Sequence, residues 1–352
     1  MRRKPLSGRA VWYHAAMRWA IVSILSLAVA LAAPQGHLKI NFIDVEGGQS
    51  TLFVLPSGES LLVDTGWPTA DSRDAHRIVA AARSYGLTRI DYVLITHYHL
   101  DHIGGVPQLA ALFPIGAFID HGPNNETDAG AKRLEAAYQK VLASGVKRLV
   151  VNPGDVLPLQ GARIEIVTAN GDRIKGHVAG GGQANPVCGS DARRPIDTSE
   201  NARSVGFVLT FGQFRTVDLG DLSWNKELDL VCPDNAIGPV DLFVVSHHGW
   251  SESDSKTLVY ALHPRVAIMD NGARKGGSPS VWHTITSSPG LQDLWQLHYS
   301  IEGGAQANVP PERIANLDEH CQGLGIEADV APDGAFSVKN LRTGFAKDYP
   351  AR

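Results

Sequence analysis

The stretch that decides the fold is Thr96–His102, which reads Thr-His-Tyr-His-Leu-Asp-His. It follows the apolar run Asp91–Ile95, which predicts a buried strand, and it precedes Ile103–Pro107, which predicts a helix. The polar side chains of the motif therefore lie on a strand-to-helix turn. Three histidines and one aspartate within six positions are more than an ordinary polar turn carries. The stretch therefore predicts a metal site.

The spacing within the motif predicts two metal positions. His97 and His99 lie two apart on extended chain, so their side chains point to one side and can bind one ion. Asp101 and His102 lie past the bend and are aimed toward a second ion. Neutral imidazole and carboxylate are suitable ligands for zinc, manganese and iron. We expect zinc as the cofactor, with two ions bound, and manganese or iron as the alternatives.

This motif resembles that of the metallo-β-lactamase superfamily, and four further segments fit the resemblance in the expected order. They are Ile43–Ser50, Leu61–Gly66, Asp218–Asp221 and Val244–Gly249. The first and the last resemble the branch that contains the hydrolase domain of the competence protein ComEC. The resemblance spans about residues 38 to 300. It implies an α/β fold, an αββα sandwich of the metallo-β-lactamase type.

The resemblance also implies roles for residues outside the first motif. Asp221 would bridge the two metals, and Asp64, at the end of an apolar strand, would hold a ligating imidazole in one tautomer. His247 and His248 follow another apolar strand. Because side chains alternate across a strand, only one of this pair readily faces a given metal. We expect His247 to be a ligand and His248 to lie near the substrate, with the reverse assignment left open.

One departure from the family concerns the first metal. Many members supply a further histidine upstream of the bridging aspartate, whereas this chain has Asn201 in that region, as the ComEC branch does. We expect Asn201 to lie beside the ligands rather than among them. His121, at the end of an apolar strand, and His177, in a glycine-rich insertion, are substitutes for the missing ligand, or else solvated loop histidines.

Outside these motifs the chain alternates predicted helices and strands. Helices are expected at Thr69–Tyr85 and Ala129–Ser144, where small and apolar residues recur at helical spacing. The expected strands Val205–Phe211 and Phe214–Leu219 are separated by Gly212 and one further residue. That connection suits a tight hairpin, because glycine supplies the positive φ that such turns need.

Length and composition indicate a leader followed by one catalytic domain. The chain has 352 residues, of which 43% are hydrophobic and 19% charged, as suits a globular enzyme. Residues 1–32 combine basic residues, a short apolar stretch and the small-residue site Ala30–Ala32, which predicts a signal peptide. An uncleaved membrane anchor is the alternative. Residues 33–352 would form the hydrolase domain, with a long loop insertion at about 170–201. We expect a periplasmic or secreted protein without stable membrane insertion after processing.

Cysteine usage leaves two arrangements open. Cys188, Cys232 and Cys321 in an exported chain leave at least one thiol unpaired. A Cys188–Cys232 disulfide would tie the long loop to the body of the domain, and three free buried thiols are the alternative. The chain has no Cys-x-x-Cys spacing, so a zinc site built from cysteines is not predicted.

Charge restricts the partners of the mature chain. Loss of the first 32 residues removes five cations and no carboxylate, so the formal charge moves from −4 to −9. Strong nucleic-acid binding is not expected, because such affinity comes largely from cations that displace phosphate counterions. Arg274 and Lys275, in the glycine-rich segment Asn271–Ser278, are expected to contact the substrate. The sequence does not indicate an oligomeric state.

The paired metals imply hydrolysis by a shared hydroxide, held by two cations about 3.5–4 Å apart, that attacks a carbonyl carbon or phosphorus. Asp101 or His248 would pass a proton to the leaving group. We expect a phosphodiesterase-like hydrolase acting on a small-molecule or phosphodiester substrate. One alternative is a β-lactamase or lactonase that opens cyclic amides or esters, although β-lactamases of this superfamily lack the aspartate found at Asp221. The other is a catalytically inactive metal-binding module.

Overall fold

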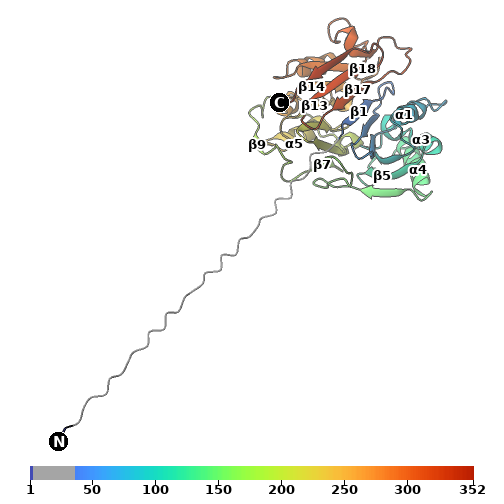
Figure 1. Ribbon diagram of the computed structural model, residues 1–352. Coiled ribbons are helices and arrows are strands. Elements are labelled where there is room, and N and C mark those ends of the chain that lie inside the picture. The colour runs from blue at the N-terminus through green and yellow to red at the C-terminus, as the bar shows by residue number, and fades with distance from the viewer. Residues whose placement is uncertain (3–35) are drawn as a thin grey trace. The chain divides into compact units, whose positions relative to one another are not determined.

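Residues 1–2 and 36–352 of the chain are described by a computed structural model (Figure 1). Contacts along the chain separate two units, Met1–Ala32 and Ala33–Arg352, and the sheets and helices belong to the second. Apart from the first two residues, the predicted signal peptide and its membrane-anchor alternative lie outside the described residues. Within the described part, no helix has both the length and the apolar character needed to cross a membrane.

The first sheet contains nine strands in the order β19-β18-β17-β1-β2-β3-β4-β5-β6. Its strands are β1 (Leu38–Phe42), β2 (Thr51–Val54), β3 (Ser60–Val63), β4 (Ile90–Leu94), β5 (Ile115–Asp120), β6 (Lys147–Val150), β17 (Ile326–Val330), β18 (Phe336–Asn340) and β19 (Ala346–Tyr349). The pairs from β3 to β6 are parallel and the remaining pairs are antiparallel. The sheet is therefore mixed.

The second sheet contains eight strands in the order β16-β15-β14-β13-β11-β10-β7-β8. Its strands are β7 (Arg163–Ala169), β8 (Asp172–Arg173), β10 (Gly206–Phe211), β11 (Phe214–Asp218), β13 (Leu242–Val244), β14 (Val266–Met269), β15 (Asp293–His298) and β16 (Ile314–Asn316). The pairs from β11 to β16 are parallel, whereas β7, β8, β10 and β11 pair antiparallel. This sheet is also mixed.

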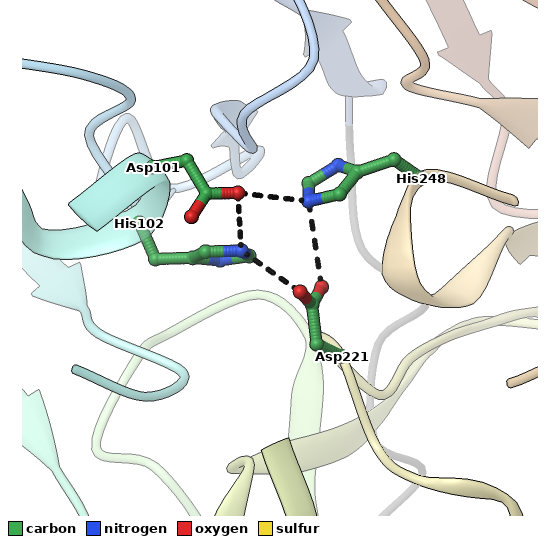
Figure 2. A group of neighbouring side chains, drawn as sticks. All are labelled: Asp101, His102, Asp221 and His248. Atoms are coloured by element: carbon green, nitrogen blue, oxygen red, sulfur yellow. Dashed lines mark ion pairs between the residues drawn. The ribbon is translucent and has the colours of Figure 1, made fainter. Parts of the chain in front are cut away.

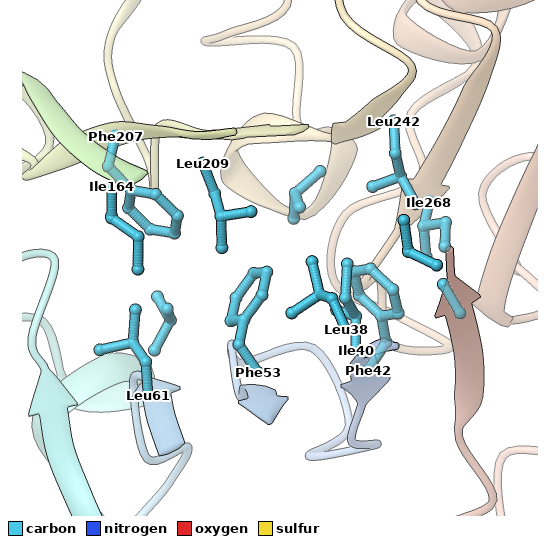
Figure 3. Close-up of a cluster of buried hydrophobic side chains, with 14 of the residues drawn as sticks. Leu38, Ile40, Phe42, Phe53, Leu61, Ile164, Phe207, Leu209, Leu242 and Ile268 are labelled. Carbon is cyan, nitrogen blue, oxygen red and sulfur yellow. The ribbon is translucent and has the colours of Figure 1, made fainter. Parts of the chain in front are cut away.

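The main hydrophobic core lies between the two sheets (Figure 3). Ile40, Phe53 and Leu61 of the first sheet face Phe207 and Leu209 of the second, and all five are buried. The rings of Phe53 and Phe207 meet edge to face, with centroids 5.9 Å apart. Burial of each such side chain stabilises the fold by about 1.5 to 3 kcal/mol, so the facing sheets form the stable centre of the domain.

Helices cover the outer face of each sheet, and each layer has its own apolar cluster. On the first sheet these are α1 (Arg73–Ser84), α2 (Leu100–Ile103), α3 (Val106–Leu112) and α4 (Ala129–Leu142). On the second they are α5 (Trp224–Val231), α6 (Lys256–Leu262) and α7 (Pro279–Thr286). Figure 1 shows the first group beside β5 and α5 on the side of the second sheet. The predicted αββα sandwich is confirmed.

The motif residues follow the carboxyl ends of strands. Asp64 follows β3, the Thr96–His102 motif follows β4, Asp221 follows β11, and the His247-His248 pair follows β13. Strands β3 and β13 are buried throughout, as expected of strands inside sheets that are covered on both faces. In such sheets the polar groups that bind ligands collect at the carboxyl ends of the strands.

The predicted insertion at 170–201 has little regular structure. It contains the two-residue strands β8 and β9 (Gln183–Ala184), and the 3-10 helix η1 (Glu200–Arg203) begins at its end. Strand β9 pairs with β12 (Asp234–Asn235), and a Cys188–Cys232 disulfide closes next to this pair. Of the two cysteine arrangements, the structure has the disulfide.

Candidate metal centre

Four buried side chains form the tightest part of the centre (Figure 2). Carboxylates and imidazoles alternate around this ring, which consists of Asp101, His102, Asp221 and His248. The Nε2 atom of His102 lies 3.3 Å from Asp101 Oδ2 and 3.2 Å from Asp221 Oδ2. The Nε2 atom of His248 lies 3.2 Å from Asp101 Oδ2 and 3.5 Å from Asp221 Oδ1. The four ligand-type atoms therefore surround one point.

A second pair of histidines adjoins this ring. The Nε2 atom of His97 lies 2.9 Å from Nδ1 of His99 and 3.8 Å from Asp221 Oδ2. Ligand atoms of a tetrahedral zinc ion lie about 3.3 Å apart, so these two nitrogens have nearly the spacing of a chelating pair. Burial and the neighbouring histidines His102 and His99 keep the pKa of His97 well below its ordinary value, so its imidazole is neutral and free to bind a metal.

Asp221 contacts both the ring and the adjoining pair of histidines. Its turn approaches the first motif closely because Gly220 has a φ of 56°, and a Cβ atom there would lie 2.8 Å from Cβ of Thr96. The amide of His247 donates to the carbonyl of Gly220 at 3.1 Å, which joins the two turns. Although burial opposes ionisation, His102, His247 and His248 hold the pKa of Asp221 well below its ordinary value. Asp221 is therefore a buried anion.

Only one of His247 and His248 was expected to face a given metal, and the structure brings both side chains to the centre. Strand β13 ends at Val244, and both histidines lie in the 3-10 helix η2 (Ser246–Gly249) with φ values of 51° and 57°. This left-handed backbone, strained for non-glycine residues, removes the alternation of a strand. The Nε2 atom of His247 consequently lies 3.4 Å from Asp221 Oδ2, while His248 joins the ring. Both imidazoles reach the centre.

Asp64 contacts the Nδ1 nitrogen of His102. Its Oδ2 lies 2.7 Å from Nδ1 of His102 and accepts from the hydroxyl of Thr96 at 2.6 Å. Its Oδ1 accepts from the Thr96 amide at 2.8 Å. Hydrogen bonding at Nδ1 leaves Nε2 as the nitrogen that faces the ring. Asp64 thus holds the ligand-bearing edge of the imidazole toward Asp221.

Several polar atoms in the ring have no hydrogen-bond partner although they are buried. They are His102 Nε2, His248 Nε2 and Asp221 Oδ1. Unsatisfied buried polar atoms are expensive, so their convergence on one point is the pattern expected of metal ligands. In the metal-free chain a proton compensates: despite burial, Asp221, Asp101 and Asp64 raise the pKa of His102 well above its ordinary value. Burial and the charge of Lys275 lower the pKa of His248. The carboxylates of Asp221 and Asp270 outweigh them and raise this pKa to about 10. The donor set fits one or two divalent cations.

Two glutamates, the half-buried Glu126 and the buried Glu200, support the motif from segments distant in the sequence, and sequence reasoning missed both. Glu126 Oε1 lies 3.0 Å from Nε2 of His99, leaving Nδ1 directed at His97. Glu200 accepts from the backbone amide of Tyr98 at 3.3 Å. No local pattern around either glutamate indicates these contacts, because the partners meet only in the folded chain.

The substitutes considered for the missing ligand lie elsewhere. The Nε2 atom of His121 lies 2.9 Å from Glu200 Oε2, and Nδ1 of His177 lies 3.1 Å from the carbonyl oxygen of Val178. Asn201 lies in η1 next to Glu200, and its side-chain oxygen is buried without a hydrogen-bond partner. Within residues 36–352, the structure gives no hydrogen bond or ion pair between these three side chains and the ring.

The two predicted substrate-binding cations have different positions. Lys275 forms an ion pair with Asp101, donates to the carbonyl of Gly47 at 2.8 Å, and lies 5.3 Å from the ring centre of Trp67 and 6.0 Å from that of Trp250. Arg274 instead pairs with Glu319 at 2.5 Å, and its side chain is 68% exposed. The structure therefore brings Lys275 to the centre and does not bring Arg274, because consecutive residues of this turn point in different directions.

A hollow of about 370 Å³ adjoins the first histidine pair. Its lining comes from the first motif, the segment before α4 and the start of α4: Tyr98, His99, Leu100, Glu126, Asp128, Gly130, Ala131, Arg133 and Leu134. The hollow thus offers a mixed apolar and polar surface directly beside His99.

The comparisons with known proteins find similarity over parts of the chain. The Metallo-beta-lactamase superfamily profile matches residues 44–187. The lactamase-like protein nscB of Neosartorya fischeri is 30% identical over 182 residues, covering 50% of this chain and 50% of that protein. An atrochrysone carboxyl ACP thioesterase of Aspergillus fumigatus is 40% identical over 67 residues, covering 19% of this chain and 20% of that protein. The metallo-beta-lactamase fold protein YhfI of Bacillus subtilis has a TM-score of 0.47 at 14% identity, covering 74% of this chain and 96% of that chain.

This chain spans about half, or less, of the length of these curated relatives. The likeness to the ComEC branch stays a prediction. The matched region contains Asp64 and the whole Thr96–His102 motif, and the fold brings Asp221 to that motif. Residues 44–187 thus match the Metallo-beta-lactamase superfamily, and the two mixed sheets flanked by helices have the metallo-β-lactamase fold.

Proposed function

We propose that this protein is a metal-dependent hydrolase whose centre is organised by Asp221. The observation that carries the proposal is the position of this buried carboxylate, which lies 3.2 to 3.8 Å from the Nε2 atoms of four histidines. Such a position suits a carboxylate that bridges two divalent ions. We expect two zinc ions, with manganese or iron as alternatives.

The chain's residues fix the geometry in which hydrolysis would occur. Divalent ions at this centre supply a Lewis acid for a substrate oxygen and lower the pKa of bound water toward neutrality. Asp64 and Glu126 hold the imidazoles of His102 and His99 in place. The Nε2 atom of His248 and the Oδ2 atom of Asp101 lie 3.2 Å apart, and whichever of the two holds no ion is placed to carry a proton to the leaving group. No serine or cysteine nucleophile is needed.

Lys275 supports phosphodiesters as the favoured substrate class. Its ammonium lies at the edge of the centre, beside Asp101 and within 6.0 Å of the ring centres of Trp67 and Trp250. A fixed cation next to a metal centre can bind a non-bridging phosphate oxygen, and an exposed indole can stack on a flat leaving group. Trp250 is 39% exposed, so its ring is available for such stacking. With the net charge of −9 after loss of the leader, this arrangement favours small substrates over long nucleic acids.

Thioesters are the second candidate class. One of the relatives is named an ACP thioesterase. The hollow beside His99 offers the apolar side chains of Leu100, Ala131 and Leu134 to an acyl group. The β-lactamase or lactonase alternative has no comparable support in the described residues, although a cyclic substrate belongs in the same test.

A substrate panel tests this proposal. The zinc-loaded chain is assayed with bis-p-nitrophenyl phosphate, an acyl thioester, nitrocefin and duplex DNA, alongside Asp221→Asn and the matched control Asp91→Asn. Asp91 pairs with Arg89 and Ser60, near the start of β4. We expect phosphodiester turnover in the wild type and the control, and a loss of about 100-fold or more in Asp221→Asn. Preference for the thioester would change the substrate class, and no turnover of any substrate would overturn the hydrolase proposal.

A further inference from the structure

A second group of ligand-type side chains meets outside the centre. Asp44 Oδ1 lies 2.8 Å from Nε2 of His298, and Asp44 Oδ2 lies 3.3 Å from Sγ of Cys321. The distance from Cys321 Sγ to His298 Nε2 is 4.0 Å, and three ligand atoms of the group lie within 4.8 Å of one another. Asp44 follows β1, His298 ends β15, and Cys321 precedes β17. Only the fold brings them together.

The orientation of His298 distinguishes metal binding from nucleophilic catalysis. In a nucleophile-base-acid arrangement, the imidazole uses one nitrogen for the nucleophile and the other for the orienting acid. Here the same nitrogen, Nε2, faces both the carboxylate of Asp44 and the sulfur of Cys321. All three side chains are therefore aimed at a common point. That arrangement suits a shared cation.

The spacing and the donor types fit a transition-metal ion. Bonds of about 2.0 to 2.3 Å place the ligand atoms of a tetrahedral zinc ion about 3.3 to 3.8 Å apart. The contacts of the group are of similar size: 2.8 Å from His298 Nε2 to Asp44 Oδ1, 3.3 Å from Cys321 Sγ to Asp44 Oδ2, and 4.0 Å from Cys321 Sγ to His298 Nε2. Glu46 Oε1, 3.9 Å from Cys321 Sγ, adds a fourth oxygen at the edge of the group. Thiolate, imidazole and carboxylate together select zinc or a similar soft divalent metal.

Arg77 compensates one carboxylate oxygen of Asp44, and the other oxygen faces His298, where a cation can bind. Arg77 contacts Asp44 Oδ2 at 3.3 Å and Glu46 Oε1 at 3.0 Å, but Asp44 Oδ1 faces His298 instead. Asp44 and His298 are almost fully buried, so an uncompensated charge there would be costly. In the metal-free chain a proton on His298 supplies the compensating positive charge. Burial lowers the pKa of His298, but hydrogen bonding to Asp44 and Cys321 outweighs burial and raises this pKa to about 9. A metal ion would replace that proton.

We propose that Asp44, His298 and Cys321 bind one divalent transition metal, zinc being preferred, separately from the Asp221 centre. The site would stabilise the loop between β1 and β2. Asp44 Oδ1 also accepts from the amide of Glu46 at 2.8 Å. At Gly48 the loop backbone comes so close to the catalytic motif that an added Cβ atom would lie 2.5 Å from the carbonyl oxygen of Asp101. The loop thus packs directly against the catalytic motif, and an ion at Asp44 would fix its position.

Cobalt spectroscopy tests the proposal, because the Asp221 centre contains no cysteine and Cys188 and Cys232 form a disulfide. The full chain, purified without reductant, is freed of metal and titrated with Co²⁺. A near-ultraviolet band from thiolate-to-cobalt charge transfer reports binding at Cys321, while visible bands report binding at the histidine and aspartate ligands. We expect the near-ultraviolet band to saturate at one ion per chain in the wild type.

Two variants separate this site from the centre. Cys321→Ser should abolish the near-ultraviolet band and lower the zinc content by one ion per chain, leaving hydrolysis of the preferred substrate measurable. Asp221→Asn should keep the band and lose metal from the centre. Circular dichroism verifies that both variants fold. Absence of the band in the folded wild type, or its persistence in Cys321→Ser, would overturn the proposal whatever the outcome of the substrate panel.

Discussion

Asp64→Asn separates the orientation of a metal ligand from the stability of the fold. The carboxylate accepts three hydrogen bonds, two from Thr96 and one from Nδ1 of His102. In the amide, one oxygen becomes an NH₂ group, which can no longer accept from the donors that faced it. When that group faces His102, the imidazole gains more from accepting at Nδ1 and carrying its proton at Nε2. The lone pair of the imidazole is then at Nδ1, which points away from the ring of ligands, and Nε2 cannot bind a metal.

The size of the effect follows from the role of such carboxylate partners. Loss of a partner of this kind lowers metal affinity about 10- to 100-fold, which is about 1.4 to 2.7 kcal/mol. Solvent does not screen the contact, since Asp64 is fully buried. The stability of the metal-free chain should change less, because the cost of burying the Asp64 carboxylate, which raises its pKa, offsets part of the gain from its hydrogen bonds.

Zinc affinity is measured by competition with a chromogenic chelator, and the stability of the metal-free chain by urea unfolding. Asp91→Asn is the control, since Asp91 also accepts hydrogen bonds within the same sheet but lies near the start of β4 rather than beyond its end. We expect weaker zinc binding in Asp64→Asn alone. Equal zinc affinities in the wild type and Asp64→Asn would refute the orienting role of this carboxylate.

Three further results are expected. Lys275→Met should raise KM for an anionic phosphodiester roughly tenfold, because it loses a charge-assisted hydrogen bond of about 1.5 kcal/mol. The control Lys140→Ala, on the exposed surface of α4, should leave KM unchanged. Equal KM values in both variants would exclude Lys275 from substrate binding. Zinc binding at pH 7 should release protons in weakly buffered solution. The pKa of His102 is raised and that of His248 is raised to about 10, so both imidazoles carry protons before zinc binds. Zinc affinity should therefore fall with decreasing pH, and pH-independent binding without proton release would contradict this. Phe53→Ala should lower the free energy of urea unfolding by about 3 to 5 kcal/mol, since Phe53 is fully buried between the sheets; a loss below 1 kcal/mol would show that the core is not centred there.

Local patterns predicted the elements that carry the centre. The expected helix Ala129–Ser144 corresponds to α4 at Ala129–Leu142. The expected hairpin is formed by β10 and β11, with Gly212 at a φ of 57°. These features depend on residues close in sequence, whose periodicity and turn chemistry act before the chain folds. The Thr96–His102 motif belongs to the same class, because one strand-to-helix turn positions all its side chains.

Long-range contacts and backbone strain were not predictable from local patterns. Glu126 reaches His99 from 27 residues away, and Glu200 reaches the amide of Tyr98 from 102 residues away. The left-handed conformation of His247 and His248 depends on the surrounding turns rather than on the strand before it. The group of Asp44 and Cys321 likewise joins residues 277 positions apart, so cysteine spacing gave no sign of it.

Metal content per folded chain tests the dinuclear centre most directly. The full chain is compared with Asp221→Asn and Cys321→Ser by elemental analysis after zinc loading and removal of free metal, with circular dichroism as the control for folding. If Asp221 bridges two ions, Asp221→Asn loses at least one zinc ion and most hydrolysis, whereas Cys321→Ser leaves the centre filled. A folded Asp221→Asn chain that keeps the wild-type zinc content and the wild-type rate would contradict the central role of this carboxylate.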